Sequence, residues 1–314
     1  MKLKTFVKRL IPFLPARAQV YLRDQNKKSQ RHARSKRERT LVHVADVLHR
    51  ISECELAGDF MIHGSITNIG KLDKPVSELM KGWIEQINLT RQTILCPALP
   101  YNTTMLEYLK ACKDFDVRSA KNAMGAISNS LMAMPGAVRS LHPTHSVVAL
   151  GASASEYVAQ HELDSSPFGP NSPYQKLTLR RGKIVMFGVG LNSVTCFHVY
   201  EDMMGSAMPL PIYLDQLFTV PCKGPTGNIT MVTTSCHNPS LSAIRECERA
   251  RSWLVEAGAI KTYTLGDSEL SVLDARLFTV TLLKMLAEGK SIYGDIKLTP
   301  TQQQWAAECR KVLD

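Results

Sequence analysis

Residues 136–151 read GAVRSLHPTHSVVALG, and polar side chains crowd this otherwise apolar run. They are Arg139, Ser140, His142, His145 and Ser146. A buried polar group without a hydrogen-bond partner costs about 1–3 kcal/mol. So many polar side chains in a buried strand would therefore destabilise the fold unless each forms a hydrogen bond, within the protein or to a ligand. The run therefore favours a site for a polar ligand, with a structural hydrogen-bond network as the alternative.

The composition indicates an ordinary globular protein. The chain has 314 residues, of which 44% are hydrophobic and 21% are charged, and this suits one large domain or two small ones. No apolar run approaches the roughly 18 residues of a membrane-spanning helix. Eight cysteines are dispersed without a CxxC pair, which argues against the common zinc and thioredoxin motifs and predicts reduced thiols in a cytoplasmic protein.

The positive charge is concentrated at the N-terminus. Residues 1–40 hold 13 Lys or Arg and only two acids, Asp24 and Glu38, whereas the remainder holds 25 basic and 26 acidic residues. We expect a basic arm over 1–40 and a single domain over 41–314. The arm is either a solvated, partly disordered tail or a contact with an anionic membrane surface at the inner face of the membrane. It lacks interleaved aromatic residues for base stacking, so no nucleic-acid partner is expected.

Hydrophobic periodicity in the body predicts an α/β fold with a mixed sheet flanked by helices. Helices are expected at 41–51, 75–87, 106–111, 241–257 and 273–287, with Gly258 closing the fourth of these. Strands are expected within 58–70, at 93–97, 146–150 and 184–189, and in a β-hairpin near 217–234. A further helix, capped by Asn192 or Ser193, would carry Thr195, His198 and Glu201.

The best chemical pair is His198 and Glu201, because residues three apart on a helix share one face. A carboxylate beside an imidazole fixes its tautomer and stabilises its charged form, as a general base requires. A plain structural pair is the alternative. Metal sites with this HxxE spacing use it in pairs with further carboxylates, and the chain has one copy, so no metal is expected. His63-Gly64-Ser65 after a strand is either a ligand approach or a tight turn.

Four segments, taken in order, are similar to motifs of one known family. They are HGSI at 63–66; FD at 115–116 with MG at 124–125; RSLHPTHS at 139–146; and GK at 182–183, followed by NSVTCFHVYE at 192–201. Together with the hairpin near 217–234 they resemble the aminoglycoside 3-N-acetyltransferase family of antibiotic acetyltransferases over roughly residues 58–290. The resemblance implies the fold of that family, which is not the fold of the GNAT superfamily.

The resemblance also implies a function, namely transfer of acetyl from acetyl-CoA to an amino group of an aminoglycoside or another amino sugar, without a metal. His198 would be the general base and Glu201 would orient it. The coenzyme would be bound by residues of the first and third segments: His63, Gly64, Ser65, Ser140, His142, Ser146 and Val147. The acceptor would meet Asp116, His145 and Thr195.

Two departures from the family's pattern bear on the acceptor. KLDKP at 71–75 stands where the family has a double glycine, and residues 98–114 contain only two acids, Glu107 and Asp114. Fewer carboxylates weaken binding of a polycation, so an amino-sugar precursor of a surface polysaccharide is an alternative acceptor to an antibiotic. Two other classes stay open: a non-catalytic scaffold that keeps the fold, and a metal-dependent hydrolase that uses His63, His142, His145 and His198.

Overall fold

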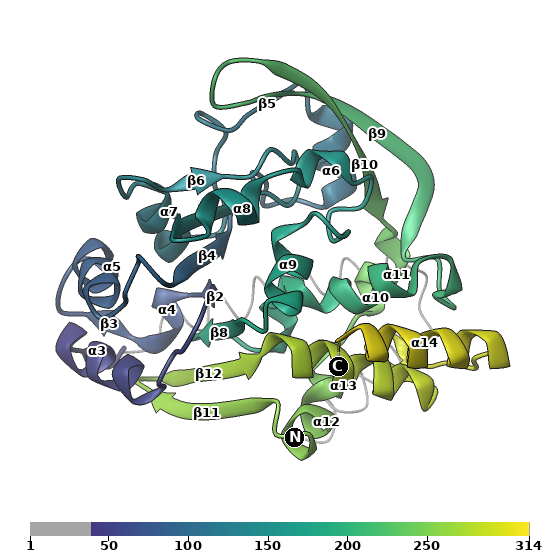
Figure 1. The fold of residues 1–314 in the computed structure, drawn as a ribbon. Helices are drawn as coiled ribbons and strands as arrows, with labels where there is room; N and C mark the ends of the chain where they lie inside the picture. Colours follow the sequence, from purple (N-terminus) through teal and green to yellow (C-terminus); the bar gives the residue numbers. More distant parts are fainter. Residues whose placement is uncertain (1–38, 314) are drawn as a thin grey trace, which may run out of the picture.

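A seven-stranded mixed sheet forms the centre of the computed structural model, which describes residues 39–313 (Figure 1). Its order is β11-β12-β8-β2-β4-β7-β6. The strands are β2 (Phe60–Gly64), β4 (Thr93–Pro97), β6 (Val138–Arg139), β7 (Val147–Gly151), β8 (Lys183–Phe187), β11 (Ile260–Leu265) and β12 (Ser268–Asp274). Strands β8, β2 and β4 run parallel, and antiparallel strands extend the sheet on both sides. The predicted mixed sheet is confirmed.

The central strands are apolar on both sides because helices cover both faces of the sheet. In β8, Ile184 and Met186 belong to one buried core, whereas Val185 and Phe187 belong to the other. The same alternation is found in β7, where Val147 and Val148 enter opposite cores. Successive side chains of a strand point to opposite faces, so these strands must be covered on both sides.

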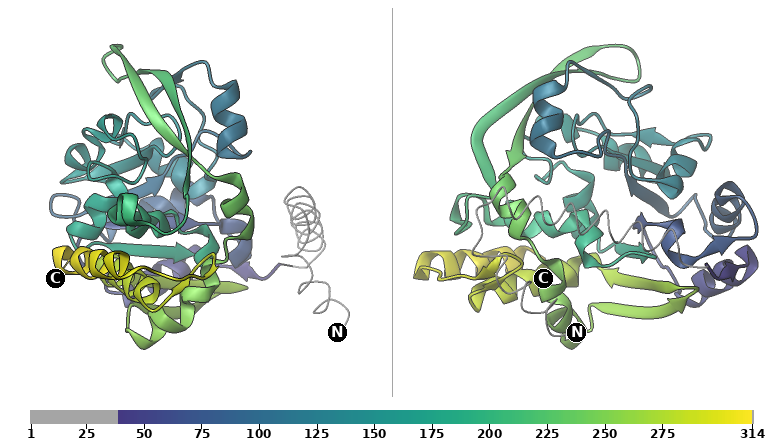
Figure 2. Two further views of the ribbon diagram at one scale, coloured as in Figure 1. Left: turned by 90° about the vertical axis from the view of Figure 1, so that its right-hand side faces the viewer. Right: turned by 180° about the vertical axis from the view of Figure 1, so that it is seen from behind.

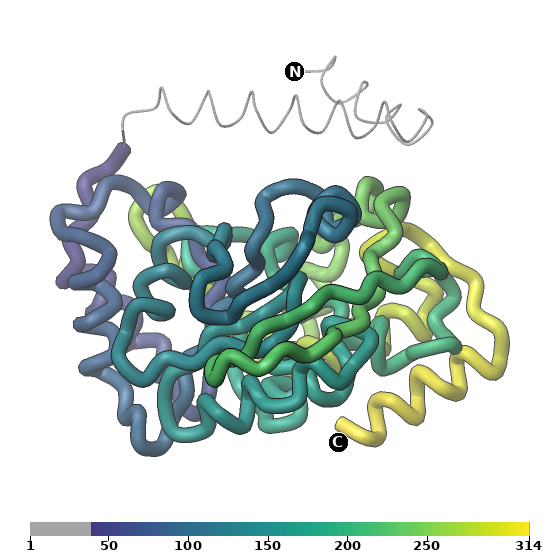
Figure 3. The backbone as a smooth tube through the Cα atoms, turned by 90° about the horizontal axis from the view of Figure 1, so that it is seen from above, coloured from purple at the N-terminus to yellow at the C-terminus, as the bar shows by residue number. Residues whose placement is uncertain are grey.

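Two sets of helices build these cores. One core takes its residues from α3 (Val44–Glu53), α5 (Val76–Glu85) and α7 (Ala126–Met132). The other uses α8 (Ala154–Val158), α9 (Pro173–Leu179), α10 (His198–Met204), α12 (Arg251–Glu256), α13 (Ala275–Ala287) and α14 (Pro300–Leu313). In Figure 3, α3 and α5 (purple to blue) lie at one end of the molecule and α14 (yellow) at the other. Within residues 39–313, no helix is long and apolar enough to cross a membrane.

The predicted hairpin is confirmed as β9 (Tyr213–Lys223) and β10 (Ile229–His237), with β5 (Phe115–Asp116) added beside β9. With α6 (Met105–Ala111) it encloses a third, smaller core. The hairpin rises from the body in both views of Figure 2. It lies on the same side of the molecule as α6, which brings two segments distant in the sequence to one edge of the fold.

Two predicted helices are wrong in detail. The helix expected over 241–257 is divided into α11 (Pro239–Ile244), a 3-10 turn η6 (Cys247–Ala250) and α12. The break arises because the Glu246 amide donates to the Ile292 carbonyl at 2.8 Å and the Cys247 amide to Asn192 Oδ1 at 2.9 Å. Likewise, 3-10 turns η3 (Leu191–Ser193) and η4 (Thr195–Phe197) precede α10, so neither Asn192 nor Ser193 caps it.

The remaining elements are short. The chain at 41–42 is strand β1 (Leu41–Val42), paired with β3 (Lys71–Leu72), and not the start of α3. The others are α4 (Ile66–Ile69), η2 (His161–Leu163), η5 (Gly205–Ala207), β13 (Lys290–Ser291) and β14 (Gly294–Asp295). Of the basic arm predicted for 1–40, only Arg39 and Thr40 fall inside the described residues; the rest of that prediction lies outside them.

Candidate active site

The carboxyl ends of the three parallel strands meet at one edge of the sheet, where α/β proteins commonly bind ligands. A cavity of about 570 Å³, which we call the strand-end cavity, opens there. It is lined by His63 and Gly64 at the end of β2, by Ser65 directly after it, by Pro97 of β4, and by Val189 after β8. Burial lowers the pKa of His63 to about 4, so this imidazole is neutral at physiological pH.

A second cavity of about 480 Å³ adjoins the first, and we call it the histidine cavity. Its lining includes His145, His198 and His237. The two cavities share three lining residues, Met124, Ser193 and Thr195. A molecule in the strand-end cavity and another in the histidine cavity can therefore meet beside Thr195.

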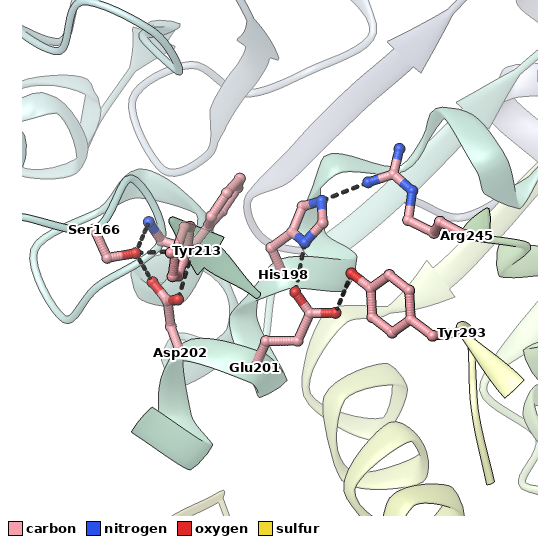
Figure 4. Close-up of polar contacts among 8 residues, drawn as sticks. Ser166, His198, Glu201, Asp202, Tyr213, Arg245 and Tyr293 are labelled. Carbon is pink, nitrogen blue, oxygen red and sulfur yellow. Dashed lines mark hydrogen bonds and ion pairs between the residues drawn. The ribbon is translucent and has the colours of Figure 1, made fainter. Parts of the chain in front are cut away.

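His198 is the first residue of α10, and Glu201 follows it one helical turn later. Their side chains point toward one another (Figure 4), with His198 Nδ1 2.6 Å from Glu201 Oε2. His198 is 4% exposed and Glu201 is 2% exposed. The second carboxylate oxygen of Glu201 accepts a hydrogen bond from the Tyr293 hydroxyl at 2.9 Å. The carboxylate is thus held in place from both sides, as an orienting group must be.

Arg245 completes the arrangement from the break between α11 and η6. Its Nη1 donates to His198 Nε2 at 2.6 Å. Because a guanidinium has no acceptor, Nε2 must be unprotonated in this geometry, and the ring proton must lie on Nδ1 and be donated to Glu201. This is the tautomer in which His198 can accept a proton at Nε2.

Burial dominates the electrostatics of the pair. It lowers the pKa of His198 well below its usual value, and the positive charge of Arg245 lowers it further. Burial also raises the pKa of Glu201 to about 8, against the opposing effects of the Tyr293 hydrogen bond and the charge of Arg245. Burial therefore disfavours the charged form of each group. Because the two groups are hydrogen-bonded, the protonation of one affects the protonation of the other.

A second carboxylate lies next to the pair on α10. Asp202 accepts hydrogen bonds from the Ser166 hydroxyl and from the Tyr213 hydroxyl, the latter at 2.7 Å (Figure 4). Burial raises the pKa of Asp202 to about 7. The Tyr213 ring stacks on His237, whose ring centroid is 4.1 Å from that of His198. Asp202 therefore holds Tyr213, which stacks on His237 beside His198.

The ligand atoms of His198, Glu201 and His237 lie within 4.8 Å of one another, close enough to hold a metal ion. Both ring nitrogens of His198 are, however, engaged, one by Glu201 and the other by a cationic donor. A guanidinium at Nε2 repels a metal cation and so disfavours metal binding at this cluster. The cluster is also a different set from the four histidines His63, His142, His145 and His198 considered for a hydrolase.

The polar run at 136–151 forms an internal hydrogen-bond network. Arg139 donates to the carbonyls of Ala98, Ala120 and Lys121 and to Ser146 Oγ. Ser140 Oγ accepts from the Val147 amide and contacts His161, which stacks on His142. Ser140, His142, Ser146 and Val147, predicted to bind the coenzyme, line neither cavity. His63, Gly64 and Ser65, predicted for the same role, all line the strand-end cavity.

Of the three residues predicted to contact the acceptor, two line the histidine cavity and one does not. His145 and Thr195 line the histidine cavity together with His198. Asp116 does not: it lies in β5, 3.0 Å from Arg118 and 3.9 Å from Lys223, and hydrogen bonds from Arg118 lower the pKa of Asp116 to about 2. Its carboxylate is already paired with cations outside the cavity.

Sequence reasoning missed several residues of the site: Arg245, His237, Tyr293, Asp202, Ser166 and Tyr213. Arg245 carried no signal because it was assigned to the interior of a continuous helix. Asp202 could have been noticed as a second acid directly after Glu201. Tyr293 comes from the loop between β13 and β14, 92 residues along the chain from Glu201. No local sequence pattern predicts that its hydroxyl contacts Glu201.

Comparison with known proteins gives a family match over residues 61–287, to the model described as aminoglycoside 3-N-acetyltransferase. Aminoglycoside N(3)-acetyltransferase IX of Micromonospora chalcea is 36% identical over 90 residues, which are 29% of this chain and 32% of the relative. Aminoglycoside N(3)-acetyltransferase VII of Streptomyces paromomycinus is 40% identical over 79 residues, 25% of this chain and 27% of the relative. The chain thus spans about a third of the length of these curated relatives.

Solved structures resemble the whole fold. AAC-IIIb in binary complex with CoASH superimposes with a TM-score of 0.63 and 21% identity, covering 80% of this chain and 98% of that chain. AAC-VIa bound to sisomicin gives a TM-score of 0.62 and 22% identity, covering 77% and 96%. These likenesses show that the fold is that of the aminoglycoside acetyltransferases.

Proposed function

The chain belongs to the aminoglycoside 3-N-acetyltransferase family, and from this premise we propose that it is an acetyl-CoA-dependent N-acetyltransferase acting on an amino group of an amino sugar or aminoglycoside. One observation carries the proposal: His198, which is buried and paired with Glu201, lines a cavity that shares lining residues with a second cavity at the strand ends. The acyl donor would occupy the strand-end cavity and the acceptor amine the histidine cavity beside His198, and the two cavities share lining residues.

His198 acts as general base in this account. The acceptor amine enters the histidine cavity and hydrogen-bonds to His198 Nε2. As the amine nitrogen forms its bond to the acetyl carbon, the carbon–sulfur bond of the thioester breaks, the amine proton passes to Nε2, and the coenzyme leaves as a thiolate that takes up a proton. During the whole reaction the Glu201 carboxylate accepts a hydrogen bond from Nδ1–H of His198, and its negative charge stabilises the imidazolium.

The strand-end cavity suits the acyl donor. Its volume of about 570 Å³ lies in the range of small-molecule sites. Two small residues of its lining, Gly64 and Ser65, would allow close approach of the thioester, and Arg39, also in the lining, offers a cation to the coenzyme's phosphates. Thr195, shared by both cavities, lies where the acetyl group would meet the amine.

For the acceptor, the names of the curated relatives favour an aminoglycoside, and an amino-sugar precursor of a surface polysaccharide is the second candidate. The second candidate is favoured by the absence of Asp and Glu among the described residues that line the histidine cavity. Polycationic drugs gain affinity from carboxylates, and this lining has none to offer.

The proposal is tested by release of coenzyme thiol from acetyl-CoA in the presence of a panel of aminoglycosides and amino sugars. We expect thiol release that depends on an acceptor and yields its N-acetyl product, identified by mass spectrometry. A protein that binds no acetyl-CoA and releases no thiol with any acceptor is instead the non-catalytic scaffold.

For residues 1–40 we propose a contact with an anionic membrane surface by a cytoplasmic enzyme. The support is compositional, namely 13 basic residues among the first 40. Sedimentation with phosphatidylserine vesicles tests it: the full chain should co-sediment, and a chain without residues 1–38 should not. Equal co-sedimentation of both would contradict the contact.

A further inference from the structure

The charge of the histidine cavity is the reverse of what a polycationic acceptor needs. Among the described residues that line it, none is Asp or Glu, and Arg245 is the only Lys or Arg. Neither Glu201, which is hydrogen-bonded to His198, nor Glu107, whose carboxylate accepts hydrogen bonds from the amide and hydroxyl of Thr104 in the cap of α6, is part of this lining. The cavity is therefore cationic.

Arg245 forms no direct salt bridge within the described chain, although its charge acts on Glu201, the hydrogen-bond partner of His198. Its guanidinium makes no salt bridge within 4.0 Å to a carboxylate of residues 39–313, and its described side-chain hydrogen bond goes to a neutral partner, His198 Nε2. The residue is partly buried. A charge removed from water without a partner is costly, so an anion that reaches Arg245 gains a charge-assisted hydrogen bond with little competition.

The same contact covers the base. An Nε2 lone pair that accepts a hydrogen bond from Arg245 is not free to receive the proton of an amine. Arg245 must therefore leave Nε2 before transfer can occur. A ligand group that attracts the guanidinium more strongly than a neutral imidazole does would move it, and carboxylate and phosphate oxygens match the planar fork of arginine.

Resting on the acetyltransferase function proposed above, we propose that the acceptor carries a carboxylate or phosphate close to its reactive amine, and that Arg245 binds this group and so uncovers His198. The acceptor is thus an acidic amino sugar and not a polycation. Arg245 both selects the acceptor and keeps the base covered until it arrives.

The test compares acceptors that differ only in the anionic group: glucosamine, glucosamine 6-phosphate and 2-amino-2-deoxyglucuronic acid, with sisomicin as the polycation. Thiol release gives kcat/KM for each at saturating acetyl-CoA. We expect at least one anionic acceptor to exceed glucosamine by about tenfold or more, as one charged hydrogen bond predicts. The phosphate and carboxylate acceptors identify which group is used.

Variants assign the preference to the residue. Arg245→Gln should abolish it and raise kcat/KM for glucosamine, whereas Arg245→Lys should keep part of it. Arg91→Gln, the same change at an exposed arginine outside both cavities, should keep all of it. A pH profile of Arg245→Gln should show its acidic limb displaced to higher pH, because a positive neighbour that lowers the pKa of both His198 and Glu201 has been removed.

Three results overturn the inference. These are equal kcat/KM for neutral and anionic acceptors, a preference for sisomicin, or a preference that survives Arg245→Gln; each leaves the acetyltransferase function intact. If no acceptor is turned over, calorimetric titration of glucosamine 6-phosphate into the coenzyme-loaded protein decides. Binding weakened about tenfold by Arg245→Gln supports the inference, and no binding refutes it. Failure to bind acetyl-CoA refutes the proposed function and this inference with it.

Discussion

His198 Nδ1 and Glu201 Oε2 lie 2.6 Å apart, and neither side chain is more than 5% exposed. In such a pair the two titrations are coupled, so the apparent pKa belongs to the pair as a whole. The base is free only when the ring carries one proton, at Nδ1, and the carboxylate carries none. An additional proton on the ring occupies Nε2, and a proton on Glu201 removes the negative charge that would stabilise the imidazolium, so either one lowers activity in the proposed reaction.

This coupling predicts the acidic limb of activity. Burial raises the pKa of Glu201 to about 8, so the pair gains its additional proton as the pH falls through about 8. We expect kcat/KM to rise with pH up to about 8 and then to level off. Acceptors whose amines have different pKa values should show the same limb, which separates the enzyme's titration from that of the substrate.

Glu201→Gln removes the titrating carboxylate and keeps an oxygen that can accept from Nδ1. We expect the limb to move to lower pH, because burial and Arg245 lower the pKa of His198. We also expect kcat to fall by about 10²-fold, since an amide stabilises the imidazolium less than a carboxylate does. A limb that stays in place would show that another group titrates.

Asp202 should make the protein less stable as the pH rises. Its pKa is raised to about 7 in the folded state, against about 3.9 in an unfolded chain. Between these values the folded state binds more protons, so the free energy of unfolding falls with rising pH, by at most about 1.4 kcal/mol per pH unit. Asp202→Asn lacks this slope. Urea unfolding at pH 5 and pH 7 checks this: from pH 5 to pH 7 the free energy of unfolding should fall more for the wild type than for Asp202→Asn. Asp215→Asn, at an exposed position of β9, should show the same fall as the wild type.

Arg139 is expected to be structural. Arg139→Met removes the guanidinium that donates to the carbonyls of Ala98, Ala120 and Lys121 and to Ser146 Oγ, and we expect the free energy of unfolding to fall by about 3 kcal/mol or more. Arg91→Met, at an exposed position, should stay within about 0.5 kcal/mol of the wild type. If the Arg139→Met protein is as stable as the wild type but no longer binds acetyl-CoA, residues 136–151 form a ligand site and not a structural network.

Gly151 ends β7 with φ +126°, and a Cβ there would lie 2.1 Å from the Gln92 carbonyl oxygen. Because that neighbour is backbone, Gly151→Ala should shift β4 or β7 and cost more than about 2 kcal/mol in the free energy of unfolding. Gly58 also has a positive φ, +76°, but open space around it, so Gly58→Ala should cost only about 1 kcal/mol. Equal losses would mean that the close approach at Gly151 is easily relieved.

The strands that could be predicted are of two kinds: central strands made apolar by burial, and the hairpin strands β9 and β10, which a turn sequence joins. β4 and β8 lie in the middle of the sheet between two cores, where β4 is fully buried and β8 reads Ile-Val-Met-Phe after Lys183. The two-residue strands β5 and β6 exist only through their partners. The helix expected over 241–257 was wrong because hydrogen bonds from Glu246 and Cys247 to distant partners interrupt a regular apolar spacing.

The site divides in the same way. The proximity of His198 and Glu201 follows from their spacing, because a single helical turn brings them together. Arg245 and Tyr293 reach this pair from 47 and 92 residues away, so only the folded chain reveals them. The polar run at 136–151 was conspicuous in the sequence, yet Arg139's partners, such as Ala98, are carbonyls that no sequence pattern marks.

The most direct test of the central claim is a comparison of the wild type with His198→Ala, measuring thiol release from acetyl-CoA with an accepted amino sugar and, separately, acetyl-CoA binding by calorimetry. His49→Ala, at an exposed histidine of α3, serves as the matched control. We predict that His198→Ala lowers kcat by about 10²- to 10⁴-fold with binding of acetyl-CoA unchanged, and that His49→Ala alters neither. Wild-type turnover by His198→Ala would contradict the assignment of His198 as the general base.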